Sequence, residues 1–178
     1  MAETKQSEFK LPNDDLSRAL TVAQPDQSDL PHIGLVGDTY TINVSGKDTN
    51  GRFCVIDMHV PTGGGPGPHR HNYDETFIVL AGQIEVTFRG EVKRVHSGYT
   101  VNIPANAPHQ FHNVAPEPAR LLCICSPAGL EEFFDALGVR VATRTTPPPA
   151  LTPEQQAAFF KKAAELAPRY QTELLPHA

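Results

Sequence analysis

The sequence has few residues of several types, and some of these shortages exclude a class of protein. It contains no tryptophan and only 3 cysteines among 178 residues. An odd number of cysteines excludes a framework in which each one is paired within the chain, and so favours a reducing compartment. No apolar run approaches the roughly 20 residues that a membrane-spanning helix needs. Residues 1–10 lack the hydrophobic stretch of a signal peptide, so we expect a cytoplasmic location.

Positive charge is also scarce. The chain has 15 Lys and Arg residues against 20 Asp and Glu residues, which gives a formal net charge of -5. Its basic residues form no block or stripe of the kind that binds nucleic acids or anionic membrane surfaces. We therefore expect no nucleic-acid partner and no membrane partner, and a small molecule is the expected ligand.

Short strands separated by turns dominate the middle of the chain. Residues 40–45 alternate between apolar and polar side chains, which is typical of a half-buried strand. Further strands are expected at residues 53–60, 77–80, 84–88, 92–95, 99–103, near Phe111 and at 121–125. Strands at about 8–12-residue spacing favour an antiparallel sandwich or barrel. The predicted fold class is therefore all-β with appended helices: a small antiparallel β-barrel or jelly roll followed by C-terminal α-helices.

Two helices are expected after the strands. Residues 130–137 place apolar side chains on one stripe, and Gly138 is a typical helix end. The segment Thr152-Pro153-Glu154-Gln155 has a capping-box pattern that begins a second helix, which runs to about Ala167. The expected organisation is an N-terminal arm at 1–33, a barrel at 34–126 and a helical extension at 127–178. The arm either lies over a neighbouring subunit or is mobile.

One cluster of histidines has the spacing of a metal site. His69 and His71 are two residues apart, so they share one face of an extended strand, and Glu75 follows in phase. His109 lies in a second segment. Three imidazoles and one carboxylate suit one divalent transition metal ion, namely iron, nickel, manganese, cobalt or zinc. His112 falls on the opposite strand face from His109 and is left out of the metal site.

Two longer motifs surround these residues. The first has the spacing Gly-x5-His-x-His-x3-Glu-x6-Gly and comprises Gly63, His69, His71, Glu75 and Gly82. The second has the spacing Gly-x5-Pro-x-Gly-x2-His-x3-Asn and comprises Gly98, Pro104, His109 and Asn113, with Asn106 in place of the central glycine. Through these motifs, residues 34–126 resemble the cupin superfamily. Asparagine tolerates a left-handed backbone better than most residues, so we expect the turn at Asn106 to be intact.

This resemblance implies a barrel whose metal ligands are His69, His71, Glu75 and His109. Residues 126–134 also resemble the helix that follows the barrel in single-domain quercetin 2,3-dioxygenase-like proteins. A metal-dependent dioxygenase acting on an aromatic or enolisable oxygenated molecule, flavonol-like or diketone-like, is therefore the expected function, and a homodimer is the expected assembly. A cupin isomerase or lyase and a non-catalytic metal- or ligand-binding cupin stay open as alternatives.

The remaining site predictions concern individual residues. Glu75 is expected to act either as a ligand alone or also as the general base that takes a substrate hydroxyl proton. The residues expected to line a substrate pocket are Tyr73, Val79, Ile84, Val101 and Phe111. Cys123 and Cys125 share one strand face; a soft-metal site is one interpretation, and small core residues are the favoured one.

Overall fold

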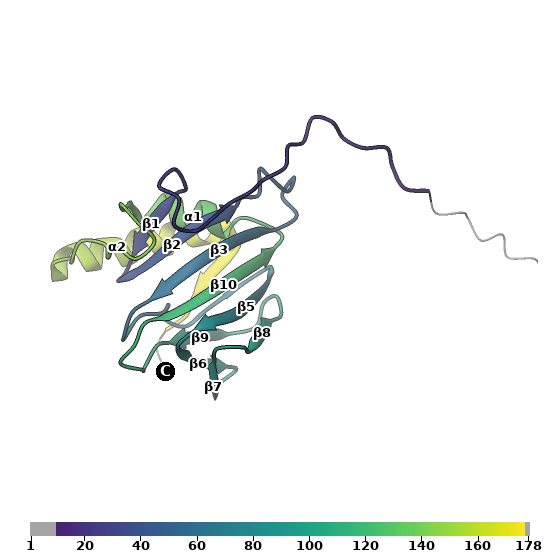
Figure 1. Cartoon of the computed structure of the whole chain (residues 1–178). Helices are drawn as coiled ribbons and strands as arrows, with labels where there is room; N and C mark the ends of the chain where they lie inside the picture. The colour runs from purple at the N-terminus through teal and green to yellow at the C-terminus, as the bar shows by residue number, and fades with distance from the viewer. Residues whose placement is uncertain (1–9, 177–178) are drawn as a thin grey trace, which may run out of the picture.

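The computed structural model describes residues 10–176 of the chain. The expected arm at 1–33 therefore lies partly outside the described residues, and residues 10–31 contain no helix or strand. Much of this segment runs away from the sheets as an extended chain (Figure 1). None of the helices within residues 10–176 is long and apolar enough to cross a membrane.

Two antiparallel sheets make up the body of the protein (Figure 1). The larger one contains, in order, β11 (Val139–Arg140), β1 (His32–Leu35), β2 (Asp38–Val44), β3 (Cys54–Val60), β10 (Ala119–Ser126), β5 (Asp74–Ala81) and β8 (Thr100–Ile103). The smaller one contains β12 (Thr172–Leu174), β4 (His69–His71), β9 (His109–His112), β6 (Gln83–Phe88) and β7 (Glu91–His96). The predicted all-β class is confirmed, and the strands form two sheets of a jelly roll rather than a closed barrel.

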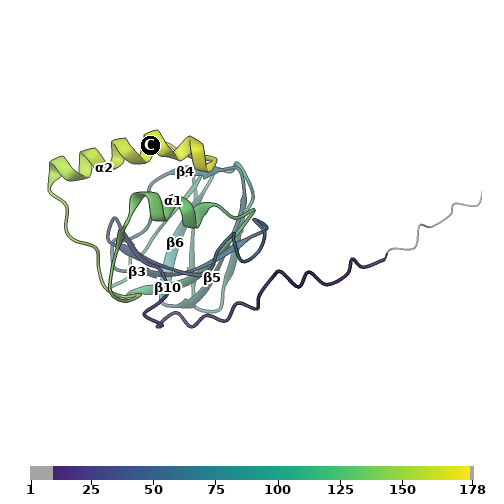
Figure 2. The same cartoon turned by 90° about the horizontal axis from the view of Figure 1, so that it is seen from above.

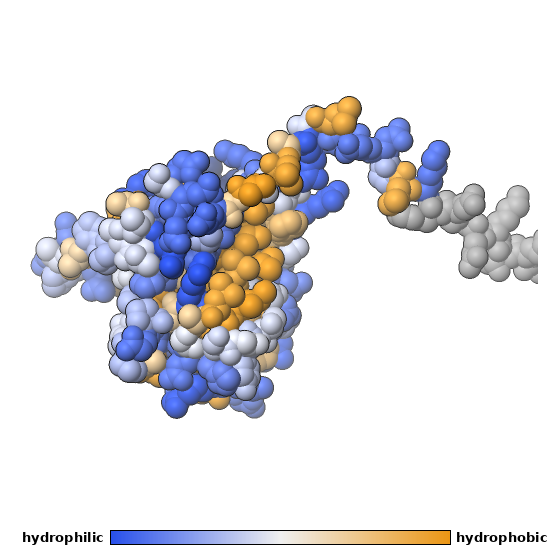
Figure 3. All heavy atoms as spheres, viewed as in Figure 1, coloured by the Kyte–Doolittle hydropathy of each residue, from blue (hydrophilic) through white to orange (hydrophobic). Residues whose placement is uncertain are grey.

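Strand alternation explains how the core forms between the sheets. In β10, Leu121, Cys123 and Cys125 are buried, whereas the residues between them are only half-buried. The half-buried residues include Leu122 and Ile124, so this strand is apolar on both faces. Figure 3 shows a hydrophobic band across the outer face of the larger sheet. Only the inner face belongs to the core that surrounds the site described below.

Two helices cover one end of the sandwich (Figure 2). Helix α1 spans Leu130–Leu137 and ends at Gly138, as predicted, and its apolar stripe is buried. Helix α2 spans Pro153–Leu166 and begins with the predicted capping box, in which Thr152 and Gln155 bond to each other's backbone N–H groups. The 3-10 helix η1 (Ala167–Tyr170) follows α2. The chain then returns to the smaller sheet as β12.

Three strands were not expected from the sequence: β1, β11 and β12. Each has between two and four residues, which is too short to show a periodic pattern of apolar side chains. The pairing of β12 with β4 matters most, because Thr172 lies opposite His71 and Leu174 lies opposite His69. The C-terminal segment therefore supports the strand that carries two of the candidate ligands.

A buried carboxyl group anchors the glycine-rich segment that precedes β4. Oδ2 of Asp38 accepts hydrogen bonds from the Gly65 N–H at 3.1 Å and from the Tyr40 hydroxyl at 2.9 Å. Its other oxygen, Oδ1, has no hydrogen-bond partner within residues 10–176. Gly65 has a φ of 116°, and a side chain there would collide with the Phe111 carbonyl group. Burial raises the pKa of Asp38 to about 7, despite the two hydrogen bonds.

This raised pKa predicts that the free energy of unfolding depends on pH, and that Asp38→Asn removes this contribution. Since the folded state holds the Asp38 proton more tightly than the unfolded chain does, this group lowers the stability of the fold as pH rises from 3.8 to about 7. We expect the free energy of unfolding of Asp38→Asn, relative to the natural protein, to increase over that pH range. Urea denaturation of both proteins at several pH values measures the difference. Parallel stability curves would contradict a raised pKa.

Candidate metal centre

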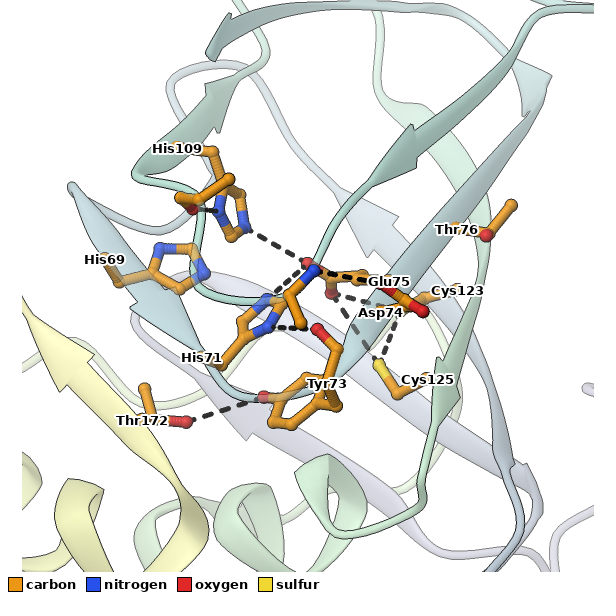
Figure 4. A network of polar contacts seen from close by, with 12 residues as sticks. His69, His71, Tyr73, Asp74, Glu75, Thr76, His109, Cys123, Cys125 and Thr172 are labelled. Carbon is orange, nitrogen blue, oxygen red and sulfur yellow. Dashed lines mark hydrogen bonds and ion pairs between the residues drawn. The ribbon is translucent and has the colours of Figure 1, made fainter. Parts of the chain in front are cut away.

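The four predicted ligands converge between the two sheets (Figure 4). One ligand atom from each of His69, His71, Glu75 and His109 lies within 4.8 Å of the others. His71, Glu75 and His109 are each 3% exposed and His69 is half-buried, so protein surrounds most of the cluster. The structure therefore brings together all four side chains that the sequence motifs selected.

Strand geometry explains this convergence. His69 lies directly opposite His109 where β4 pairs with β9, and His71 follows on the same face of β4. The chain then turns at residues 72 and 73 and enters β5 in the other sheet, where Glu75 points inward. Three ligands therefore come from the smaller sheet and one comes from the larger sheet.

Each imidazole is oriented by a backbone carbonyl group. The Nδ1 atoms of His69, His71 and His109 lie 2.9 Å from the carbonyl oxygens of Gly67, Tyr73 and Ala107 respectively. A carbonyl oxygen can only accept, so each Nδ1 carries the proton in this arrangement. In a neutral imidazole the Nε2 atom then keeps a free lone pair for a metal ion.

The contacts of Glu75 strengthen this interpretation. Its Oε2 atom lies 3.0 Å from Nε2 of His71 and 3.2 Å from Nε2 of His109. Burial opposes ionisation of Glu75, but hydrogen bonds from the two imidazoles in their protonated form outweigh burial and hold the pKa of its carboxyl group below the usual value. When the imidazoles are neutral and protonated at Nδ1, the carboxylate oxygen and the two nitrogen lone pairs repel one another unless a cation lies among them. The donor set therefore fits a divalent metal ion.

His69 differs from its two neighbours because no hydrogen bond to its Nε2 is found within the described residues. Burial and the charge of His109 lower the pKa of His69 to about 4. The ring therefore stays neutral near pH 7, and a neutral imidazole is the form that binds metals.

An apolar cavity of about 220 Å³ adjoins the cluster. His69, His71 and Glu75 form part of its wall, and α1 and α2 contribute Leu130, Phe133, Phe134, Leu137, Phe159, Phe160 and Ala163. Of the five residues predicted to line a pocket, Tyr73 and Phe111 do so. Val79, Ile84 and Val101 do not, because the first two are enclosed in the core and the third packs against that core.

Several neighbours of the cluster have structural roles. Tyr73 stacks on His71 with a ring-centroid distance of 3.9 Å, and its hydroxyl group lies 3.5 Å from that of Thr172. Asn106 has a φ of 67°, as its substitution for the motif glycine predicted. Asn113 is fully buried and bonds to the backbone at Val60, Ala115 and Glu117. His112 lies outside the cluster, as expected, and its Nδ1 atom contacts the Gly64 carbonyl group.

Two features of the site were missed at the sequence level. The first is the contribution of α1 and α2 to the cavity, because helix periodicity does not say which surface a helix covers. The second is that Cys123 and Cys125 contact Glu75 from β10. Their burial agrees with the favoured interpretation as core residues. Only the strand register, which no short motif encodes, places their sulfur atoms beside a ligand.

The comparisons with known proteins agree with this geometry. Residues 56–125 match the family described as the cupin domain. An uncharacterised protein of Methanocaldococcus jannaschii is 32% identical over 84 residues, which is 47% of this chain and 67% of that protein. The structure of a predicted oxalate decarboxylase from Thermotoga maritima aligns with a TM-score of 0.52 and 16% identity, over 60% of this chain and 98% of the other. The chain belongs to the cupin family.

One relative has a named activity. Quercetin 2,3-dioxygenase of Bacillus subtilis is 30% identical over 106 residues, which is 58% of this chain. The match covers 31% of the dioxygenase, so the chain spans about a third of its length.

Removing a single imidazole tests the ligand set. We expect His69→Ala and His109→Ala to lose bound metal, because each substitution deletes one nitrogen donor without replacing it. Elemental analysis of protein purified without an affinity metal measures metal content per chain. His96→Ala is the control, since His96 lies on the exposed edge strand β7. Full metal occupancy in both ligand variants would show that the assignment is wrong.

Proposed function

We propose that this protein is a metal-dependent dioxygenase acting on an aromatic or enolisable oxygenated small molecule, either flavonol-like or diketone-like. The observation that carries the proposal is the contact between a largely buried three-histidine, one-glutamate cluster and an apolar cavity. Four protein ligands leave one or two positions open on a five- or six-coordinate ion, and open positions distinguish catalytic sites from closed structural ones. The similarity to a quercetin 2,3-dioxygenase supports this choice of reaction.

The cavity supports the choice of substrate class. Its wall is mostly aromatic and aliphatic, so an aromatic or branched carbon skeleton would bury its surface there. His69, His71 and Glu75 supply metal-binding polar groups to this wall. A substrate with one oxygen-bearing edge would therefore place that edge at the cluster and its apolar part against α1 and α2.

The protein's own residues have distinct roles in this proposal. A divalent iron, nickel, manganese, cobalt or zinc ion held by the cluster would supply Lewis-acid polarisation of a substrate oxygen. The three imidazoles fix the position of the site through their carbonyl contacts. Glu75 has a carboxylate oxygen at the centre of the cluster, where it can accept the proton of a substrate hydroxyl group. Tyr73 and Phe111 form part of the cavity wall, where they would contact the substrate.

Oxygen uptake tests the proposed reaction. We expect the metal-loaded protein to consume O2 with at least one compound in a screen of flavonols, catechols and diketones. Bound redox-capable metal without oxygen uptake on any of these compounds would contradict a dioxygenase. It would instead favour a cupin isomerase or lyase, or a binding protein.

Glu75→Gln separates the two roles of this residue. The amide keeps the shape of the side chain but cannot accept a proton, so we expect turnover to fall by about 10²–10⁴-fold if Glu75 is the general base. Metal content and turnover are measured on the same sample, and turnover is expressed per bound ion. Full turnover per bound ion would exclude the base role and leave Glu75 as a ligand.

A pair of alanines on α2 tests the cavity as the substrate site. Ala163 lines the cavity, whereas Ala164 is exposed on the same helix. We expect Ala163→Leu to raise KM and to leave the metal content unchanged, because the added carbons occupy space that the substrate needs. Ala164→Leu is the matched control and should change neither quantity. Equal KM values in the two variants would place the substrate elsewhere.

We also propose that the protein forms a homodimer and is located in the cytoplasm, as expected from the sequence. The outer face of the larger sheet supports pairing, since Val55 and Ile124 lie opposite each other there, as do Ile78 and Leu122. A contiguous apolar face of this kind favours association with another surface (Figure 3).

A further inference from the structure

The two carboxylate oxygens of Glu75 have different surroundings (Figure 4). Oε2 faces the imidazoles of His71 and His109. Oε1 faces the sulfur atoms of β10, with Cys123 Sγ at 3.2 Å and Cys125 Sγ at 3.9 Å. No other hydrogen-bond partner of Oε1 is found within residues 10–176. The hydrogen bonding of this oxygen therefore depends on thiols.

Strand register produces this arrangement. Cys125 lies directly opposite Glu75 where β10 pairs with β5, and Cys123 is two residues earlier on the same inward face. On the other side of β10, Cys54 of β3 lies opposite Cys125. All three cysteines are fully buried, yet the described structure contains no hydrogen bond between Cys54 and Glu75. Cys54 contacts Cys125 and not the carboxylate, so it is the internal control for Cys123.

We propose that the Cys123 thiol, with Cys125 as a secondary contact, donates a hydrogen bond to Oε1 of Glu75 and so leaves only Oε2 to bind the metal. Cys123 is then a positioning residue. The effect on metal binding rests on the proposed metal site. The contact between the thiol and Oε1 does not require a metal ion.

The physical argument concerns rotation of the carboxylate. A glutamate end group turns readily about its last torsion, so without a partner for Oε1 it can present both oxygens to one ion. Bidentate binding would use one of the open positions that the proposed reaction needs. A thiol is a weak donor, so it fixes the orientation while leaving Oε2 basic. Residues that orient metal ligands in this way commonly change metal affinity by about 10–100-fold when mutated.

Glu75, Cys123 and Cys125 also have the mutual spacing of a possible metal site. Binding of a soft ion would require these thiols, which are fully buried, to lose their protons. The cavity beside the imidazoles is not lined by these cysteines. Hydrogen-bond donation is therefore the arrangement that the geometry favours, and an ion bound to sulfur is an outcome that the experiment below can detect.

Infrared spectroscopy of the metal-free protein tests the contact. We expect the S–H stretching region to contain a component shifted to lower frequency by a hydrogen bond to a carboxylate. Cys123→Ala should remove that component, and Glu75→Gln should move it towards the frequency of a free thiol. Cys54→Ala should leave it in place. A band that is unaffected by Cys123→Ala, or the absence of S–H bands because ions occupy the thiols, overturns the proposal.

Cobalt substitution tests the consequence for the metal. We expect Co²⁺-loaded Cys123→Ala to show weaker visible absorption than the natural protein, since a higher coordination number lowers the intensity of these bands, and to bind Co²⁺ about 10–100-fold less tightly. Cys123→Ser keeps a donor and should restore both values, whereas Cys54→Ala should match the natural protein. Identical spectra and affinities for Cys123→Ala and Cys54→Ala overturn the positioning role.

These two measurements also separate this inference from the proposed function. If the infrared contact and the cobalt spectra behave as expected but no oxygen is consumed, the dioxygenase proposal fails and the role of Cys123 stands. If oxygen is consumed but the infrared band is the same in Cys123→Ala, the role of Cys123 fails and the dioxygenase proposal stands.

Discussion

The mutual repulsion of acceptor atoms at one buried point is the constraint on which the rest of the structure depends. Nε2 of His71 and Nε2 of His109 lie 3.0 and 3.2 Å from the same carboxylate oxygen of Glu75. Because Nδ1 of each ring already faces a carbonyl oxygen at 2.9 Å, the Nε2 atoms have no proton to donate while the rings are neutral. A divalent cation bound among these atoms would remove the repulsion. The protein buries the three side chains, so water does not screen the repulsion when the cation is absent.

The fold holds these groups in place from both sheets. The smaller sheet supplies the imidazoles through β4 and β9, and the C-terminal strand β12 pairs with the outer side of β4. The larger sheet supplies Glu75 together with the thiols that contact its second oxygen. Asp38 holds the glycine-rich segment that leads into β4. Elements from distant parts of the chain therefore fix one carboxylate and three rings, and α1 and α2 close the apolar cavity beside them.

Much of the site could be predicted from the sequence, because its ligands follow local periodicity. The two-residue spacing of His69 and His71 fixes a shared strand face, and Asn106 adopts the left-handed backbone that its place in the motif required. Contacts that depend on register and on helix placement could not be predicted. Val79 and Ile84 are inward-facing strand residues, as Phe111 is, but they lie in the core and Phe111 lines the cavity. The Cys123 sulfur reaches Glu75 only because β10 pairs with β5 in one particular register.

X-ray absorption spectroscopy of the metal-loaded protein tests the central claim most directly, because it reports the atoms bound to the ion. The structure predicts nitrogen and oxygen neighbours only, with the multiple scattering of imidazole rings that corresponds to His69, His71 and His109. A sulfur neighbour would place the ion against Cys123 and Cys125 instead. Absence of imidazole scattering would contradict the three-histidine, one-glutamate site altogether.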